Sequence, residues 1–142
     1  MGTMNWLEQI VVTPLQHISV PGGDVLHGMK ATESSFQGFG EAYFSWIEPG
    51  VVKAWKRHLQ MTMNLIAPVG RVRFVFHDPE CGYFREESIG ESNYCRLTVP
   101  PKIWFGFQGM AAYPSLLLNL ASTPHAPEEV ERTNKEGFHF CW

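Results

Sequence analysis

Lys56 and His58 are the residues best suited to proton transfer. They stand two positions apart in residues 51–58, a stretch of mixed apolar and polar residues that we predict to be a strand. An imidazole titrates near neutral pH and can act as a base, while an ammonium can stabilise a developing anion. A lysine that burial makes less basic can also act as the base itself. Side chains two apart on a strand share a face, so both groups can meet one ligand if that face lines a pocket. The pair suits removal of a proton from a carbon next to a carbonyl group.

Several other side chains could hold a ligand beside this pair. Glu41 and Tyr43 share one face of the preceding predicted strand. Lys53 has the opposite parity to Lys56 and reaches the same face only if the strand carries a bulge near Ala54. The remaining candidates are Arg71 and Arg73 for phosphate contacts, Asn64 at a strand start, and Trp104 at the mouth of a pocket. Each candidate, including Lys56 and His58, also has a structural interpretation as a surface charge or a packed side chain.

Short strands must position these residues. Runs rich in β-branched and aromatic residues are separated by Gly, Pro, Asp and Asn turn signals at intervals of roughly 8–12 residues, which is typical of an antiparallel sandwich or barrel. We predict a helical turn around residues 6–10 and a short helix at 127–132. The predicted strands are 17–20, 25–27, 41–47, 51–58, 63–68, 71–77, 83–89, 95–99, 104–107 and 115–121.

A length of 142 residues fits one domain that can bury a core without disulfides. We therefore predict a single all-β domain over residues 1–142. The barrel is expected at about residues 40–127, where the strand signals are regular. The glycine-rich residues 1–40 are expected to form an irregular N-terminal arm.

Composition excludes several classes of function. A net charge of −3 without a basic cluster argues against binding to nucleic acid or to an anionic membrane surface. The longest apolar stretch, residues 115–121, is too short to span a bilayer, and residues 1–12 do not resemble a signal peptide. Three widely spaced cysteines predict reduced thiols and a cytoplasmic protein. No His, Cys or carboxylate spacing indicates a metal site, and we predict no cofactor.

Three blocks, residues 50–58, 68–75 and 97–107, together resemble the dTDP-4-dehydrorhamnose 3,5-epimerase family. That family shows GVLRGLH, a strand ending in a glycine turn, and a PxGFxHGF-like block in the same order. The resemblance covers about residues 40–130, and the aromatic C-terminal end is similar too. It implies a cupin-type jelly-roll barrel, a homodimer, a dTDP-sugar bound in the barrel mouth, and no metal.

The resemblance implies an epimerase or isomerase of a dTDP-linked 4-keto-6-deoxy sugar, acting in cell-surface polysaccharide or deoxysugar biosynthesis. It places Glu41 and Tyr43 at nucleotide-holding positions, and His58 at the second position of the HxH pair found in the related 3,4-ketoisomerases. Family residues are replaced at six matching positions, namely Lys53, Lys56, Met63, Phe74, Phe105 and Leu118. Two alternatives therefore stay open, a dTDP-sugar 3,4-ketoisomerase and a non-catalytic cupin that only binds sugar nucleotides.

Overall fold

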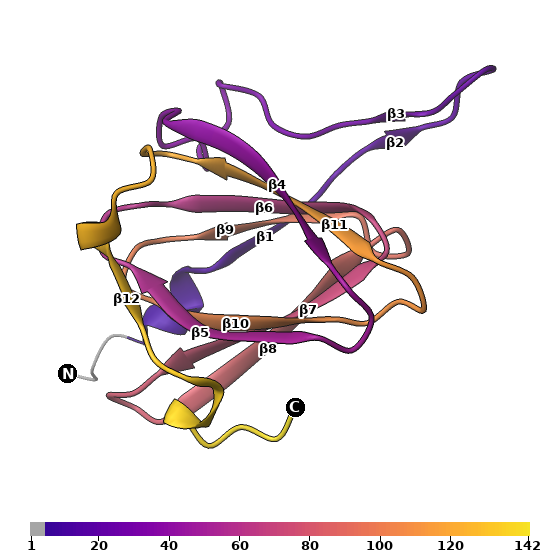
Figure 1. Cartoon of the computed structure of the whole chain (residues 1–142). Helices are drawn as coiled ribbons and strands as arrows, with labels where there is room; N and C mark the ends of the chain where they lie inside the picture. The colour runs from indigo at the N-terminus through magenta and orange to yellow at the C-terminus, as the bar shows by residue number, and fades with distance from the viewer. Residues whose placement is uncertain (1–4) are drawn as a thin grey trace.

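The computed structural model describes residues 5–142, and β-strands make up most of their regular structure (Figure 1). Three short 3₁₀ helices, η1 (Trp6–Gln9), η2 (Pro127–Glu129) and η3 (Lys135–Gly137), accompany the strands. The strands in the described residues are β1 (Val11–Pro14), β2 (His17–Ile18), β3 (Val25–Leu26), β4 (Glu41–Ile47), β5 (Val52–His58), β6 (Met63–Val69), β7 (Arg71–Asp78), β8 (Tyr83–Gly90), β9 (Cys95–Val99), β10 (Trp104–Gly109), β11 (Ser115–Ala121) and β12 (Val130–Arg132).

Two five-stranded sheets face each other and form the barrel. The first has the order β1-β9-β6-β11-β4, and the second has the order β12-β5-β10-β7-β8. Neighbouring strands pair antiparallel throughout both sheets. Because many neighbours are distant in sequence, the strands cross between sheets as in a jelly roll. The prediction of an all-β, cupin-type barrel is confirmed.

The sheets extend beyond the predicted barrel at both ends of the chain. β1, from the predicted irregular arm, pairs with β9 at one sheet edge. The predicted helix at 127–132 is instead a 3₁₀ turn followed by β12, which pairs with β5. Both differences have one cause, since an unpaired edge of a sheet offers backbone hydrogen bonds that a nearby segment can complete. The barrel therefore runs from Val11 to Arg132. Of the predicted arm, residues 1–4 lie outside the described part of the chain.

The hydrophobic core fills one side of the space between the sheets. Its fully buried members include Val72, Phe76, Ile89, Leu97 and Val99, which come from strands toward the β8 and β9 side. Polar residues occupy inward positions on the opposite side, beside β4 and β5. This uneven filling leaves a cavity next to β4 and β5, which the next subsection describes.

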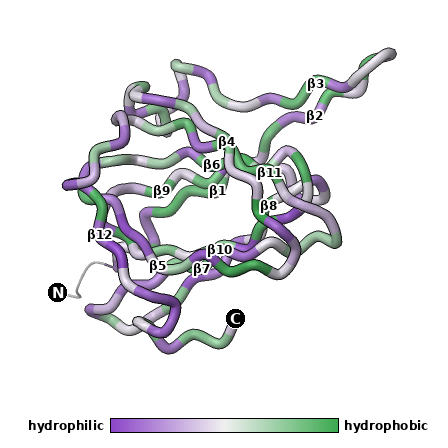
Figure 2. The backbone as a smooth tube through the Cα atoms, viewed as in Figure 1, coloured by the Kyte–Doolittle hydropathy of each residue, from purple (hydrophilic) through white to green (hydrophobic). Residues whose placement is uncertain are grey.

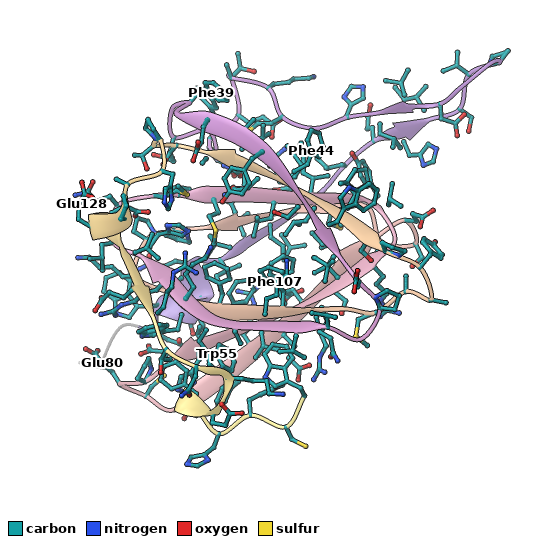
Figure 3. The ribbon with its side chains drawn as sticks, in the orientation of Figure 1. Phe39, Phe44, Trp55, Glu80, Phe107 and Glu128 are labelled. Atoms are coloured by element: carbon teal, nitrogen blue, oxygen red, sulfur yellow. The ribbon has the colours of Figure 1, made fainter. Side chains whose placement is uncertain are left out.

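The C-terminal segment covers the outer face of the second sheet. Phe138, Phe140 and Trp142 pack around Trp55, with ring centroids 5.4, 6.3 and 5.4 Å from its own. The Trp55 Nε1 group donates a hydrogen bond of 3.1 Å to the carbonyl of Lys135. Figure 3 shows Trp55 beside this segment, and Phe107 between the sheets. These aromatic contacts keep Trp55 only 1% exposed, although it points away from the barrel interior.

A buried arginine holds part of the N-terminal arm against the first sheet. Arg96, on β9, is 0% exposed, donates to the carbonyl of Gly28 at 2.6 Å, and pairs with Glu33. Beyond this anchor, β2 and β3 form a two-stranded hairpin that projects away from the barrel (Figure 1).

Candidate active site

A β-bulge in β5 decides which residues of this strand face the barrel interior. Phe105 lies opposite Lys56, Gly106 opposite Ala54, and Phe107 opposite Lys53, so β5 carries one extra residue in this stretch. A bulge changes the parity of every residue beyond it. Lys53 and Lys56 therefore share the inner face with Phe107 and Phe105. From the sequence, Lys53 was expected to share the face of Lys56 only if β5 had a bulge near Ala54, and the structure has this bulge.

On the outer face of the same stretch, Gly106 and Ala54 pack closely against each other and against Trp142. A Cβ atom added to Gly106 would lie 2.6 Å from the Ala54 Cβ atom and 3.0 Å from the Trp142 ring. Only glycine therefore fits between Ala54 and the C-terminal aromatic residues. Close packing on the outside fixes the bulge and so holds the two lysines inward.

The inward lysines open onto a cavity of about 360 Å³ at the barrel mouth. Its walls include Lys53, Lys56 and Arg132 with the rings of Phe105 and Phe107. A narrower extension of about 50 Å³ continues between the sheets. There the walls are Tyr43, Ser45, Lys56, Met63, Leu65, Phe74, Phe105, Phe107, Leu117 and Asn119. The size and the few polar groups on apolar walls are typical of a small-molecule site.

Three cations gather at this mouth. Arg132 on β12 lies directly opposite Lys56 on β5, and Lys53 follows on the same inner face. Among the ion pairs formed within residues 5–142, none includes Lys53, Lys56 or Arg132. Cations held together without carboxylate partners suit an anionic ligand such as a diphosphate.

Lys56 is the cation that reaches furthest into the cavity. Its Nζ atom lies 5.6 Å from the centroid of the Phe105 ring. Burial, followed by the charges of Arg132 and Lys53, lowers the pKa of Lys56 below its ordinary value of 10.5, although Glu129 partly opposes the shift. A lowered pKa increases the fraction of neutral amine that can accept a proton.

His58 is held by a buried carboxylate that lies 71 positions along the chain. Its Nδ1 atom is 2.5 Å from the Oε1 atom of Glu129, and both side chains are 3% exposed. The other Glu129 oxygen accepts from the backbone N–H groups of Gln60 and Met61, each at 3.3 Å. Nε2 of His58 is buried and has no hydrogen-bond partner within residues 5–142. The His58 ring stacks on Phe105 with centroids 6.1 Å apart, and Phe105 rather than His58 lines the cavity.

Burial decides the charge states of this pair. Burial lowers the pKa of His58 below 6.5 more strongly than Glu129 raises it, so the imidazole is neutral at pH 7. Burial also works against ionisation of Glu129, but hydrogen bonds from His58, Gln60 and Met61 hold the pKa of that carboxyl below 4.5. A neutral imidazole that donates Nδ1–H to a carboxylate leaves the lone pair of Nε2 free.

These shifts predict how stability depends on pH. Because the pKa of His58 is lower in the folded chain than in the unfolded chain, the unfolded chain binds a proton at His58 more readily as pH falls below 6.5. The free energy of unfolding should therefore fall as pH decreases. Glu129 adds a second loss as pH falls from 4.5 through its lower folded pKa. His77, whose pKa burial also lowers, contributes in the same direction as His58. Urea unfolding at a series of pH values should show that His58→Asn has a shallower slope just below pH 6.5, and an unchanged slope would contradict the assignment.

The wall formed by the first sheet carries a second polar pair. Asn119 on β11 lies opposite Tyr43 on β4, and its Nδ2 group donates to the Tyr43 hydroxyl oxygen at 3.0 Å. Asn119 is 2% exposed, while Tyr43 is 37% exposed and lines the narrow part of the cavity. The site therefore has polar groups on both sheets.

The structure separates the other predicted ligand-binding residues from the cavity. Asn64 faces away from it, because Met63 and Leu65 on either side point in; its amide bonds Thr98 at 2.6 Å and the Ser35 carbonyl at 3.2 Å. Trp104 also faces outward, where it packs on Phe138. Strand parity therefore places Asn64 and Trp104 on outer faces, away from this cavity, and their ligand-binding roles stay predictions.

Glu41, Arg71 and Arg73 also lie outside the cavity walls. Glu41 is half-buried at the start of β4, opposite Ala121, and does not line the cavity. Arg71 is exposed where β7 begins, at the end of the barrel away from His58. Arg73 pairs with Glu86 and lies over the Phe140 ring on the outer face. Their charges therefore do not reach a ligand beside Lys56 in this arrangement, and the binding roles of Glu41 and Arg71 stay predictions.

Three site residues were not predicted from the sequence. Glu129 and Arg132 stand in the segment read as a short helix, and Asn119 stands in an apolar strand. The single polar residue within Leu116–Ala121 was a signal for Asn119, since a polar side chain in a buried strand usually has a partner. Glu129 and Arg132 gave no comparable signal, because charged residues near a chain end are usually solvated.

Two general features of the described residues complete this picture. Within residues 5–142, no group of three or more His, Cys, Asp or Glu side chains is placed to hold a metal ion. None of the helices in that part of the chain has the length and hydropathy needed to cross a membrane.

The fold and the site define a cupin-type barrel with a small-molecule cavity between its sheets. No protein-family model matches the chain. A dTDP-sugar isomerase from Desulfovibrio desulfuricans G20 is similar over 96% of this chain and 90% of its own, with 34% identity and a TM-score of 0.88. The dTDP-4-dehydrorhamnose 3,5-epimerase of Sulfolobus tokodaii shares the fold at 17% identity and a TM-score of 0.78, over 92% of this chain and 80% of its own.

A curated relative agrees with these structures. A probable low-salt glycan biosynthesis epimerase from Haloferax volcanii is 36% identical over 84 residues, which are 55% of this chain and 54% of the relative. The match thus spans about half the length of that relative. The chain belongs to the dTDP-4-dehydrorhamnose 3,5-epimerase family of dTDP-sugar epimerases and isomerases, as the three sequence blocks predicted.

Proposed function

We propose that the protein is an epimerase or isomerase of a dTDP-linked 4-keto-6-deoxy sugar, working in polysaccharide or deoxysugar biosynthesis. The observation that carries the proposal is Lys56, a half-buried amine in the cavity wall that forms no ion pair within residues 5–142. Burial and neighbouring cations lower its pKa. Lys53 and Arg132 beside it supply positive charge for the diphosphate of a sugar nucleotide. No cofactor is needed for proton transfer of this kind.

In the proposed reaction, Lys56 removes a proton from the carbon next to the ketone. The electrons of the broken C–H bond form a C=C bond, and the carbonyl oxygen becomes an enolate oxygen. The lysine is then an ammonium beside that oxygen, which stabilises the intermediate. We assign Lys56 the role of base because it lines the cavity, whereas Phe105 covers His58.

His58 is proposed as the residue that positions this wall. Glu129 fixes its Nδ1 atom, and its ring supports Phe105, over which the Lys56 ammonium lies. His58 would become the base only if Phe105 moved aside. The effects of Lys56 and His58 variants, compared in the Discussion, distinguish the two assignments.

The proposal is tested with dTDP-4-keto-6-deoxyglucose in deuterated water. We expect deuterium at a carbon next to the ketone, detected by NMR or mass spectrometry. Calorimetric titration with dTDP distinguishes this enzyme from a non-catalytic binding protein. Such a protein would bind dTDP but would not incorporate deuterium into the sugar. Absence of both exchange and binding would overturn the assignment to this substrate class.

We also propose that the protein is a homodimer whose contact includes the β2–β3 hairpin and the outer face of β4. Ile18, Val25 and Leu26 on the hairpin are each more than 40% exposed, and Figure 2 shows hydrophobic residues along it. β4 is a sheet edge whose outward Phe44 and Trp46 are 62% and 59% exposed. A two-stranded hairpin is marginal alone in water, and an apolar sheet edge favours association.

A charge on the hairpin should break this dimer. We expect Val25→Glu to sediment as a monomer at concentrations at which the unaltered protein is a dimer, because the charge would be buried without a partner. Met110→Glu, at an exposed turn after β10, is the matched control and should remain dimeric. A Val25→Glu variant that stays dimeric would contradict this interface.

We also propose a cytoplasmic location, because Cys81, Cys95 and Cys141 are all free thiols in the structure.

A further inference from the structure

Two residues of β5, Ala54 and Trp55, lie opposite a single residue of β10, Gly106. Gly106 is paired with Ala54, and the next pair of the two strands already involves Lys56. Trp55 is therefore the extra residue that a bulge contains. Without this bulge, strict alternation from Lys56 would put Lys53 on the outer face of the sheet, away from the cavity. The position of one cation in the mouth therefore depends on the bulge.

Contacts from the C-terminal segment hold the extra residue Trp55 on the outer face. Its backbone N–H donates to the Thr133 carbonyl at 3.0 Å, and the Thr133 N–H donates to the Trp55 carbonyl at 3.1 Å. These bonds give the extra residue backbone partners although it has no partner on β10. The rings of Phe138, Phe140 and Trp142, here called the aromatic clasp, pack around its indole.

Trp142 covers the bulge itself. Two of its ring atoms lie 3.0 and 3.1 Å from the position that a Cβ atom of Gly106 would take, and the Ala54 Cβ atom lies 2.6 Å from the same position. The Trp142 Nε1 atom is buried and has no hydrogen-bond partner within residues 5–142. Packing therefore holds this ring, together with the Arg73 guanidinium, which lies 5.7 Å from its centroid.

We infer that the aromatic clasp positions Lys53 by keeping the bulge in β5, and so helps the site to bind the diphosphate of its ligand; this inference rests on the proposed function. Lys56 depends less on the clasp, because it is paired with Arg132 on β12. Two positions further along β5, His58 is held by Glu129. Loss of the clasp should therefore weaken diphosphate binding and leave proton transfer nearly unchanged.

Calorimetric titration with dTDP measures the expected loss in Trp142→Ala. We expect Kd to rise by about tenfold, as for the loss of one charge-assisted hydrogen bond to phosphate. Deuterium uptake at saturating dTDP-4-keto-6-deoxyglucose should stay within about threefold of the unaltered rate, because Lys56 keeps its place. Trp142→Phe keeps a ring and loses no hydrogen bond, so it should bind dTDP more tightly than Trp142→Ala.

A double variant shows whether the clasp acts through Lys53. Lys53→Met alone should weaken dTDP binding by a similar factor, and Trp142→Ala added to it should cause little further loss. Equal losses with and without Lys53 would overturn the inference, since the effects of independent sites add. Trp6→Ala is the matched control, because Trp6 is a partly buried tryptophan that packs against the core from η1, and it should leave Kd unchanged.

A crystal structure of Trp142→Ala tests the inference without any ligand. We expect Lys53 to have left the cavity wall, and an intact bulge with Lys53 in its present place would overturn the inference. An unchanged Kd for Trp142→Ala would also overturn it and leave the proposed function intact. If the unaltered protein bound no dTDP, the assignment to this substrate class would fail, while the place of Lys53 in the variant would still decide the role of the clasp. Thermal unfolding checks that each variant is folded, and Trp142→Phe replaces Trp142→Ala throughout if the latter is not.

Discussion

Lys56→Met is expected to slow deuterium uptake from solvent by about 10²- to 10⁴-fold, the range associated with loss of a general base. Methionine keeps the length and packing of the lysine stem but has no group that can accept a proton. The cavity walls contributed by Phe105 and Phe107 should therefore stay in place. The rate of exchange is measured by NMR with saturating substrate, so that weaker binding does not mimic slower chemistry.

Lys53→Met is the matched control for this experiment. Lys53 lies on the same inner face, but it is exposed and its Nζ atom is 3.4 Å from the Trp46 carbonyl. Loss of its charge should raise KM for a diphosphate ligand and change kcat little, because the interaction is made equally in the ground and transition states. If His58→Asn abolished exchange while Lys56→Met retained it, the base would be His58 instead.

The pH profile gives a second view of the same assignment. A lysine base is active when neutral, so kcat should rise with pH and level off above the pKa of Lys56. Burial and the charges of Arg132 and Lys53 place that pKa below 10.5. A rise completed below pH 6.5 would instead indicate His58, whose pKa is lowered by burial.

Trp55→Ala is expected to have the largest effect on stability, a loss of about 3–5 kcal/mol in the free energy of unfolding. Trp55 is 1% exposed, and the rings of Phe84, Phe138, Phe140 and Trp142 surround it. Removal of the indole leaves a cavity under the C-terminal segment and frees the Lys135 carbonyl. Urea unfolding followed by circular dichroism measures the change.

Trp55→Phe provides the comparison for this prediction. It keeps an aromatic ring but loses the Nε1 donor, so its cost should lie well below that of Trp55→Ala. The two variants should also differ at the site, because Trp55 is next to Ala54 and Lys56 in the bulged stretch. A Trp55→Ala protein with unchanged stability would show that the C-terminal segment does not depend on this ring.

Much of the fold was predictable because its signals are local. Alternating apolar residues and turn residues mark strands such as β4, β7 and β11 without knowledge of their partners. The edge strands β1 and β12 were missed as barrel strands, because each forms by pairing with a strand about 70 or more positions away. Such short segments have too few residues for a periodic signal.

The candidate site was predictable only in part. Lys56 and His58 were found from residue type and spacing, and both do face the barrel interior. Asn64 and Trp104 lie on the outer faces of their sheets, and the sequence alone does not show which face a strand residue takes. Glu129 was missed because its pairing with His58 joins segments that only the pairing of β12 with β5 brings together.

By itself, the sequence determined the strand pattern, the barrel class and family, and the choice of Lys56 and His58, because these depend on residue types at short spacing. Tertiary structure alone decided that Lys53 turns inward at a bulge, that Glu129 holds His58, and that Tyr43 and Asn119 stand on the wall opposite Lys56. The reason is physical: which face a side chain takes, and which distant group it meets, depends on strand register and sheet packing, and neither is written in any short run of residues.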